Sequence, residues 1–251
     1  MDRITSRKNP VIVHIRKLVS DREYRYTCRE YVCEGITLLE EALSAGMEIC
    51  TVIWSEDHEI KPIHAEDQHE VPVELYSYVS PLKSSPGPLF TVRMPVSDVE
   101  GKIGSAIILE NVQDPGNIGT VIRTANAFGI GSVVLAGSCA DHYSIKAVRA
   151  SMGAVFRQRV DIVQIADLRS FAGSNSLRLY AAALSEKAVD IRSIDCKGCA
   201  IAVGNEGGGL SSELMEICEG KVIIPMTLHA ESLNAAVAAS ILMWEMRRRE
   251  K

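Results

Sequence analysis

The stretch Gly204-Asn205-Glu206-Gly207-Gly208-Gly209-Leu210-Ser211 follows the apolar run 200–203 and decides how the second half of the chain is organised. A strand that stops at several glycines lets a ligand approach its backbone closely. The spacing differs from the Gly-x-Gly-x-x-Gly dinucleotide fingerprint, and the carboxylate of Glu206 would repel a phosphate. The loop therefore favours a neutral or cationic ligand. A plain strand-to-helix turn, with Ser211 as the helix N-cap, is the alternative interpretation.

Six short apolar runs alternate with helical patterns from residue 105 onward, at 106–109, 132–135, 160–163, 179–184, 200–203 and 222–224. Near-continuous apolar strands with helices between them predict a mostly parallel sheet that is covered on both faces. Ligands of such sheets bind at the carboxyl ends of the strands. The pattern predicts an α/β domain over residues 104–251, with its ligand beside the loops that follow residues 109, 203 and 224.

Polar residues fill the other two of these loops. The first reads Glu110-Asn111-Val112-Gln113-Asp114-Pro115-Gly116-Asn117-Ile118-Gly119-Thr120-Val121-Ile122-Arg123. If a helix starts near Asn117, Arg123 lies almost two turns in and shares an outer face with Thr120 and Asn126. The third loop reads Ile224-Pro225-Met226, then Glu231-Ser232-Leu233-Asn234, and opens a helix over 235–248. For Ser232 alone, capping that helix is the simpler role.

Residues 1–96 predict a separate, smaller α/β domain. A helix is expected over 11–19 with Ile12, Ile15 and Val19 facing inward, and another over 36–45 with Ile36, Leu39 and Leu43 on one face. Strands are expected near 31–33, 50–54, 71–75 and 89–94. A domain of this size lies near the common range. Residues 95–104 have the composition of a linker, so we expect the boundary there.

The composition is that of a globular chain of 251 residues, 47% hydrophobic and 24% charged. No run reaches the roughly 20 apolar residues of a membrane span, and the first residues lack a signal-peptide core. Seven cysteines, an odd number, favour a reducing cytoplasm over a disulfide framework. Cys196 and Cys199 have the spacing of a zinc or redox pair, but no second pair or nearby histidine joins them. The sequence predicts a cytoplasmic protein with neither a membrane partner nor a metal.

The net charge of −5 speaks against nucleic acid as a partner, but its distribution does not. Residues 1–31 contain eight Lys and Arg against four Asp and Glu. A second basic set consists of Lys146, Arg149, Arg157 and Arg159. Two basic sets in an acidic protein favour contact with a polyanion, and a solvated charged face is the alternative.

Together the three loops resemble the motifs of the SpoU (TrmH) family of S-adenosylmethionine-dependent RNA ribose 2′-O-methyltransferases. The matching residues are Asn111, Asp114, Pro115, Asn117, Gly119 and Arg123, then residues 204–207, then residues 224–226 and 231–234. The resemblance extends to the front of the chain, where residues 4–6, 9–10, 34–36 and 40–43 look like the family's substrate-binding domain. It also includes Lys146 and residues 149–154. Leu228 and Ala235 depart from the family pattern.

The resemblance implies a deep trefoil knot in the C-terminal domain, a ribosomal-protein-like N-terminal RNA-binding domain, and a homodimer with its active site at the subunit interface. It implies S-adenosylmethionine as the cofactor, held by Gly204, Asn205, Gly207, Ile224, Met226 and Leu233. It places the reaction at Asn117, Arg123, Glu206, Ser232 and Asn234. Ribosomal RNA is the favoured substrate, with transfer RNA as the alternative and no DNA.

The expected chemistry is an in-line displacement at a sulfonium methyl group, in which orientation can remove roughly 7–11 kcal/mol of the barrier. A guanidinium keeps its proton at neutral pH and makes a poor base. We therefore expect Arg123 to bind the target phosphate and stabilise the developing alkoxide. Two other functions stay open: a non-catalytic RNA-binding module, and a nicotinamide dehydrogenase suggested only by Gly129-Ile130-Gly131.

Overall fold

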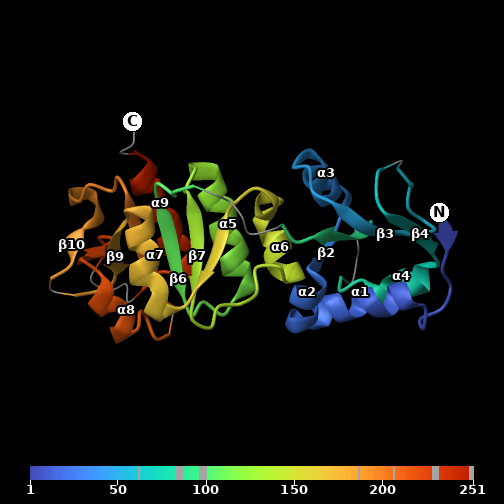
Figure 1. Ribbon diagram of the computed structural model, residues 1–251, viewed down its shortest axis with the longest axis horizontal. Helices are drawn as coiled ribbons and strands as arrows, with labels where there is room; N and C mark the ends of the chain where they lie inside the picture. The colour runs from blue at the N-terminus through green and yellow to red at the C-terminus, as the bar shows by residue number, and fades with distance from the viewer. Residues whose placement is uncertain are drawn as a thin grey trace. The chain divides into compact units, whose positions relative to one another are not determined.

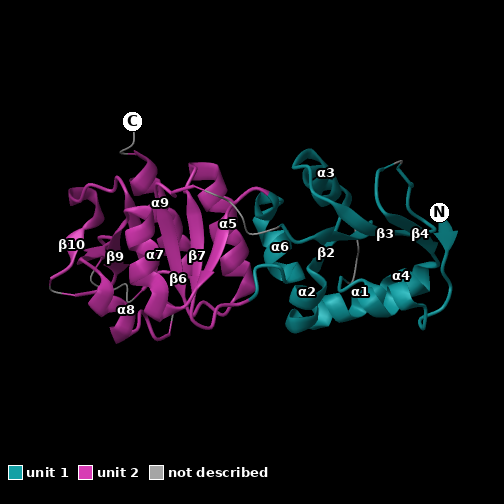
Figure 2. Cartoon of the chain, viewed as in Figure 1, with its two compact units in different colours: residues 1–97, 141–156 teal, residues 98–140, 157–251 magenta. Residues whose placement is uncertain are grey.

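The computed structural model describes residues 1–61, 63–82, 87–95, 101–185, 187–205, 207–227 and 232–248. The chain divides into two compact units (Figure 2). The first unit contains Met1–Ser97 and Asp141–Phe156, and the second contains Asp98–Ala140 and Arg157–Lys251. The segment Asp141–Phe156 thus belongs to the first unit, although it lies inside the range 104–251 that the sequence assigned to the second domain.

The second unit contains, within the described residues, a seven-stranded sheet whose neighbouring strands are all parallel (Figure 1). Its order is β10 (Val189–Asp190), β12 (Gly220–Ile223), β9 (Arg178–Ala182), β11 (Cys199–Val203), β6 (Ala106–Glu110), β7 (Ser132–Ala136) and β8 (Val160–Val163). The predicted parallel α/β sheet is confirmed. The chain runs outward from β6 through β7 and β8, then continues on the other side of β6. This reversal of strand order lies between β6 and β11, and ligands bind such sheets at this kind of point.

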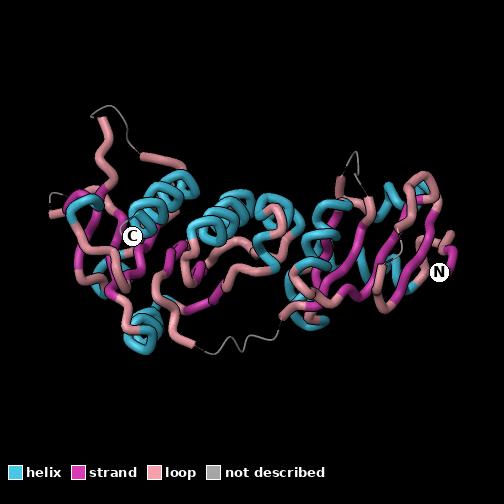
Figure 3. The backbone as a smooth tube through the Cα atoms, turned by 90° about the horizontal axis from the view of Figure 1, so that it is seen from above, coloured by secondary structure: helices cyan, strands magenta, loops and turns pink. Residues whose placement is uncertain are grey.

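Helices lie on both sides of this sheet (Figure 3). They are α5 (Pro115–Phe128), α7 (Leu168–Asn175), α8 (Ser212–Ile217) and α9 (Ala235–Arg248), with the short 3-10 turns Ile165–Asp167 and Ile191–Ser193. Every residue of β6 and of β11 is buried, because both faces of these central strands are covered. Helices α5 and α9 pack side by side, and the rings of Phe128 and Trp244 lie 5.6 Å apart.

Helix α5 begins at Pro115, so its N-cap is Asp114 and not Asn117. The Asp114 side chain caps it by accepting a hydrogen bond from the Gly116 N–H at 2.8 Å, and Pro115 occupies the first position. Gly129 ends the helix in the left-handed conformation, at φ 68°. The Gly129-Ile130-Gly131 stretch is therefore a helix C-cap, and the dehydrogenase alternative loses its only support.

The first unit contains a mixed sheet in the order β1 (Asp2–Arg3), β4 (Asp67–Val71), β3 (Ile49–Ser55), β5 (Leu89–Arg93) and β2 (Glu30–Glu34). Strand β5 is antiparallel to both of its neighbours, whereas β1, β4 and β3 are parallel. The helices of this unit are α1 (Pro10–Ser20), α2 (Arg22–Cys28), α3 (Ile36–Ser44), α4 (Val73–Val79) and α6 (Ile145–Ser151), followed by the 3-10 turn Ala154–Phe156. Helices α1 and α4 share one core with β2, β3 and β4.

The predicted strand over 71–75 is wrong. Strand β4 ends at Val71, and Pro72 then caps helix α4. Leu75 and Val79 face the core, whereas Val73 is 40% exposed. Leu75 and Val79 are four positions apart, which is close to the helical period. Because Val73 is apolar although exposed, the residues Val71, Val73 and Leu75 show the alternating apolar pattern that is typical of a strand.

Two predicted inward faces shift by one position. Leu18 rather than Val19 completes the buried face of α1, and Ala42 rather than Leu43 that of α3. Helix α2 was not predicted from the sequence because the one residue that it buries is Arg25. A charged residue on the inner face leaves no apolar periodicity to detect.

Arg25 fixes the segment Asp141–Phe156 to the first unit. Its guanidinium forms a buried ion pair with Asp141 at 2.7 Å and donates to the Leu18 carbonyl at 2.6 Å. The Tyr26 hydroxyl donates to the same carboxylate at 3.1 Å. A buried ion pair resists separation, since removing either partner leaves an uncompensated charge. This explains why a segment far along the chain packs with the N-terminal unit.

His142, next to this ion pair, makes the stability of the first unit depend on pH. Burial lowers the pKa of its imidazole to about 4; the carboxylate of Asp141 opposes this effect and the charge of Arg22 adds to it. An unfolded histidine titrates near 6.5, so between these values the unfolded chain binds the additional proton. We expect the free energy of unfolding to fall by about 3 kcal/mol as pH falls from 6.5 to 4.

Urea titrations of the wild type and of His142→Phe at pH 7 and pH 4.5 measure this contribution. The variant should lose less stability between the two pH values than the wild type does. Equal losses in both proteins would contradict the assignment to His142.

None of the helices in the described part of the chain combines the length and the apolar character that crossing a membrane requires. The deep trefoil knot stays an expectation from the resemblance. Residues 206 and 228–231, with Glu206, Leu228 and Glu231 among them, lie outside the described residues.

Candidate active site

The three loops singled out in the sequence meet at the carboxyl end of the parallel sheet. Two side-chain hydrogen bonds connect them. The Asn205 amide donates to the Asn111 carbonyl at 3.1 Å, which joins the loop after β11 to the loop after β6. The Asn234 amide donates to the Asn117 side-chain oxygen at 3.2 Å, which joins the loop before α9 to α5. Residues up to 117 positions apart thus form one site.

The loop after β11 closes upon itself. Asn205 accepts a backbone hydrogen bond from Gly209 at 2.9 Å, and its side-chain oxygen accepts one from Gly207 at 2.6 Å. A Cβ atom at Gly204 would lie 2.2 Å from the backbone carbon and oxygen of Gly209. The glycine at 204 is therefore required by the loop's own backbone, whereas the sequence interpretation attributed it to a ligand.

Glu110, which we did not identify from the sequence, anchors this loop. Its side chain is fully buried at the end of β6 and accepts hydrogen bonds from the Ser211 N–H at 2.7 Å and from the Ser211 hydroxyl. The same hydroxyl accepts from the Leu214 N–H at 3.1 Å, so Ser211 caps α8 as predicted. An acidic residue at the end of a buried strand needs hydrogen-bond partners. The position of Glu110 directly after the apolar run 106–109 is the sequence feature that could have identified it.

A cavity of about 350 Å³ lies between the loops after β9, β11 and β12. Five of the six residues predicted to hold the cofactor line it: Gly204, Asn205, Ile224, Met226 and Leu233. Ser232 also lines it, whereas Gly207 does not. The remaining walls are apolar and come largely from residues 182–184, 222–223 and Ala235. Its volume lies within the usual range for small-molecule sites.

Of the predicted reaction residues that the structure describes, Ser232 lines this cavity, whereas Asn117, Arg123 and Asn234 do not. Asn117 and Asn234 bond to each other, as described above. Arg123 is exposed on α5 and forms no hydrogen bond or ion pair with the described residues. Glu206 lies outside the described residues. The structure therefore leaves the guanidinium of Arg123 available to an anion.

Ser232 does not cap α9, contrary to the sequence expectation. The Asn234 side-chain oxygen accepts from the N–H groups of Ala236 and Val237, at 3.0 and 3.3 Å. Asn234 thus caps the helix with its oxygen while its amide reaches Asn117. Ser232 is exposed at the cavity wall, where its hydroxyl can face a ligand.

Residues 104–244 match the model of the SpoU rRNA Methylase family, which is more than half of the chain. The chain belongs to the SpoU rRNA methylase family. It is 30% identical to the Bacillus subtilis 23S rRNA (guanosine(2553)-2′-O)-methyltransferase RlmP, over 98% of this chain and all of that one. It is 28% identical to the Streptomyces viridochromogenes 23S rRNA (uridine(2479)-2′-O)-methyltransferase, over 97% and 91% of the two chains.

A solved structure of similar fold is the AdoMet-bound rRNA methyltransferase from Sinorhizobium meliloti. It superposes with a TM-score of 0.85 at 29% identity, over 98% of this chain and 97% of that one. The fold of this SpoU protein is thus that of an S-adenosylmethionine-dependent methyltransferase, which confirms the fold, the enzyme class and the cofactor predicted from the three loops.

The cavity of this SpoU protein suits S-adenosylmethionine. No Lys, Arg or His is among the described residues that line it, so the positively charged sulfur would meet no like charge there. Apolar side chains such as Leu184, Ile224 and Leu233 can enclose an adenine ring. Backbone groups of the loops after β11 and β12 lie at the cavity wall and can supply hydrogen bonds.

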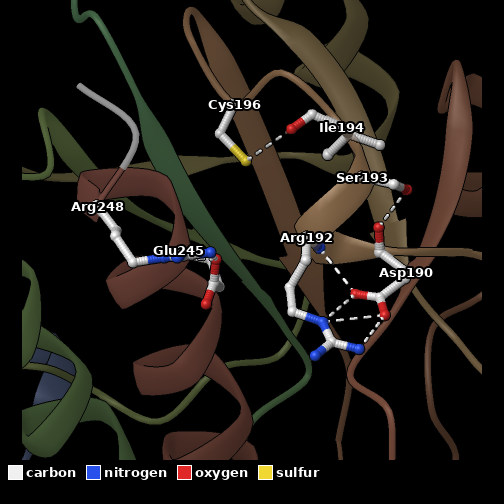
Figure 4. Close-up of polar contacts among 7 residues, drawn as sticks. All are labelled: Asp190, Arg192, Ser193, Ile194, Cys196, Glu245 and Arg248. Atoms are coloured by element: carbon white, nitrogen blue, oxygen red, sulfur yellow. Dashed lines mark hydrogen bonds and ion pairs between the residues drawn. The ribbon is translucent and has the colours of Figure 1, made fainter. Parts of the chain in front are cut away.

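The Cys199 thiol of this SpoU protein is held in its protonated form. Cys196 and Cys199 are buried, and the hydrogen bond between the Cys199 thiol and the Cys196 sulfur together with burial raises the pKa of the Cys199 thiol. A thiol that stays protonated is neither a nucleophile nor a metal ligand. Figure 4 shows Cys196 directed toward the Ile194 carbonyl, near the ion pair of Asp190 with Arg192.

Gly204→Ala is expected to weaken S-adenosylmethionine binding at least about tenfold, which corresponds to about 1.4 kcal/mol. The added methyl group would collide with the Gly209 backbone and force the loop after β11 open. Titration calorimetry measures the change. The matched control is Gly173→Ala on α7, since a Cβ there meets no atom within 4 Å and Gly173 does not line the cavity. Equal affinities for the two variants would contradict the role of this close approach.

Proposed function

We propose that this protein transfers a methyl group from S-adenosylmethionine to the 2′-hydroxyl of a ribose in ribosomal RNA. The observation that carries the proposal is the Asn234–Asn117 hydrogen bond, which brings the predicted reaction residues of α5 beside the cofactor loops. The relatives from Bacillus and Streptomyces, both named 23S rRNA 2′-O-methyltransferases, support ribose as the target and ribosomal over transfer RNA. Action on ribosomal RNA places the protein in the cytoplasm.

The cofactor, when bound, supplies a methyl group on a positively charged sulfur that departs as a neutral thioether without needing an acid. The protein's task is therefore to orient the ribose and to stabilise the oxygen as it loses its proton. Arg123 binds a phosphate of the target nucleotide and stabilises the developing alkoxide with its two-pronged guanidinium. A phosphate oxygen or a water molecule takes the proton, because a guanidinium holds its own at neutral pH.

Asn117 and Asn234 position this arrangement. Their hydrogen bond holds the start of α5 against the start of α9, and Ser240 with Thr124 extends the contact at 3.4 Å. Arg123 lies between these two contacts along α5. Small displacements of a reacting group can be costly, so this bracing supports the orientation on which the rate depends.

A homodimer with the active site at the subunit interface is part of the proposal. Two apolar residues of α9 support it, since Val237 is 48% exposed and Trp244 is 51% exposed. A second copy that covers this face would bury both residues and would bring groups of both subunits near Arg123.

Trp244→Glu should shift the protein to a monomer in analytical ultracentrifugation, and an unchanged mass would contradict this interface.

The test of the function uses in vitro transcribed ribosomal and transfer RNA with S-adenosylmethionine labelled in the methyl group. Label should enter ribosomal RNA, and a substrate that lacks the target 2′-hydroxyl should take up none. Incorporation into transfer RNA alone would replace the substrate assignment. Calorimetry with the cofactor separates an enzyme from a non-catalytic RNA-binding module, which would bind RNA but not S-adenosylmethionine.

A further inference from the structure

Asn111 stands directly after strand β6 in a backbone conformation that residues other than glycine rarely adopt. Its φ of 55° lies in the left-handed region. Three other described non-glycine residues have a positive φ, and each of them ends a helix, where this conformation is common: Arg29, Met152 and Ser176. Asn111 follows a strand and ends no helix, so its conformation has a different cause.

The left-handed turn directs three groups of Asn111 to three partners. Its N–H donates to the Ala136 carbonyl at 3.1 Å, and its side-chain oxygen accepts from the Ser138 N–H at 2.8 Å. Its carbonyl accepts from the Asn205 amide at 3.1 Å. A Cβ at Gly137 would lie 2.5 Å from the Asn111 side-chain oxygen, so the loop after β7 leaves room for this side chain. Asn111 thus ties the loops after β7 and β11 to the end of β6.

The bond to Asn111 determines how the carboxamide of Asn205 is oriented. The Asn205 amide nitrogen faces the Asn111 carbonyl, which leaves the amide oxygen to accept from the N–H groups of Gly207 and Gly208 at 2.6 and 3.3 Å. Asn205 and Gly208 line the cofactor cavity, whereas Asn111 does not. The Asn111 carbonyl therefore acts on the cavity through Asn205.

Two consecutive residues hold the two ends of the glycine loop 204–211. The side chain of Glu110 holds Ser211 at the end of the loop, and the backbone of Asn111 holds Asn205 near its start. A loop that is fixed before its ligand arrives need not be ordered on binding, and this saving increases affinity. The pair of anchors thus prepares the loop for the cofactor.

We propose that Asn111 is a positioning residue for S-adenosylmethionine. Its left-handed backbone holds the Asn205 carboxamide and so keeps the glycine loop in the shape that binds the cofactor. The family resemblance matches Asn111 to a motif but gives it no role. The proposed role concerns the cofactor alone and is the same whichever RNA is methylated. Asn111 contributes to cofactor affinity and does not touch the reacting atoms.

The test separates the backbone of Asn111 from its side chain. Asn111→Gly removes the bond to Ser138 but adopts the left-handed conformation without strain. Asn111→Ala removes the same bond and lacks the polar side chain with which asparagine tolerates that conformation. The matched control is the same pair of substitutions at Ser176, whose φ is 57° at the end of α7, away from the cavity. Urea unfolding gives the stability of each variant, and calorimetry gives the dissociation constant of S-adenosylmethionine.

Asn111→Ala should bind the cofactor about tenfold more weakly than Asn111→Gly, because the alanine variant must adopt a strained backbone to form the binding loop. At Ser176 the alanine and glycine variants should differ in stability but bind the cofactor equally. In methylation assays the rate that Asn111→Ala loses at limiting cofactor should be largely recovered at saturating cofactor, as expected for a residue that acts on binding.

Equal cofactor affinities for the two Asn111 variants would overturn the proposal, as would an equal difference in affinity for the pair at Ser176. Asn111→Asp keeps the acceptor for Ser138 and tolerates the left-handed backbone, so it should bind the cofactor like the wild type. A stable Asn111→Gly or Asn111→Asp with strongly reduced affinity would also refute the backbone role, so the test stays decisive if Asn111→Ala does not fold.

These outcomes are distinct from a failure of the proposed function. If the wild type methylates no RNA, the calorimetric comparison still decides the role of Asn111. Normal methylation together with equal cofactor affinities of the Asn111 variants would refute the positioning role alone.

Discussion

Arg123→Ala is expected to slow methyl transfer about 10²–10³-fold, the usual effect of removing one group that stabilises charge in the transition state. Arg123 forms no hydrogen bond or ion pair with the described residues and lies outside the cofactor cavity. The dissociation constant of S-adenosylmethionine should therefore stay unchanged. Single-turnover assays with labelled cofactor measure the rate, and calorimetry measures the affinity.

Two further variants sharpen this prediction. Arg123→Lys keeps the charge but loses the two-pronged geometry, so it should stay close to the alanine variant in rate. Arg169→Ala removes an exposed arginine from α7, on which no described contact depends, and should react like the wild type. Near-normal turnover of Arg123→Lys would exclude the bidentate role.

Glu110→Ala is expected to destabilise the second unit by about 2–4 kcal/mol, because it removes a buried side chain and leaves two hydrogen-bond donors of the partly buried Ser211 without their partner. The loop after β11 depends on the same anchor. Cofactor affinity should therefore fall about a hundredfold, which corresponds to roughly 2.8 kcal/mol. Urea unfolding and calorimetry measure the two effects.

Ser211→Ala should reproduce part of this loss, since it removes one bond to Glu110 and the cap of α8, a cap being worth about 0.5–2 kcal/mol. The control is Glu216→Ala, an exposed acidic residue on α8. If Glu110→Ala binds the cofactor like Glu216→Ala, Glu110 does not anchor the loop.

The parallel sheet was predictable because its central strands β6, β7 and β11 are buried on both faces and therefore consist largely of apolar residues. The positions of the loops followed from the rule that parallel strands end at one edge. The cavity-lining residues Gly204, Ile224 and Leu233 could be named in advance through the family resemblance. Composition alone would have indicated only that a ligand site lay near those strand ends.

Other features depend on contacts between distant residues, which no local pattern reveals. The buried ion pair of Arg25 with Asp141 produces a helix without apolar periodicity and moves the segment Asp141–Phe156 into the first unit. The burial of Glu110 depends on Ser211, 101 positions away. The exposed Val73 hides the helical period of α4. In the first two cases a polar partner distant in the sequence allows a charged side chain to be buried, and in the third one exposed apolar side chain obscures the helical period.

The cofactor's methyl group is expected to reach a ribose oxygen. A direct test methylates large-subunit ribosomal RNA with labelled S-adenosylmethionine and then hydrolyses it in alkali. A 2′-O-methyl group blocks cleavage of the adjacent phosphodiester bond, so the label should appear in one alkali-resistant dinucleotide. Arg123→Ala should abolish this signal in the same reaction time. Label recovered on a base, in mononucleotides released by alkali, would contradict transfer to the ribose.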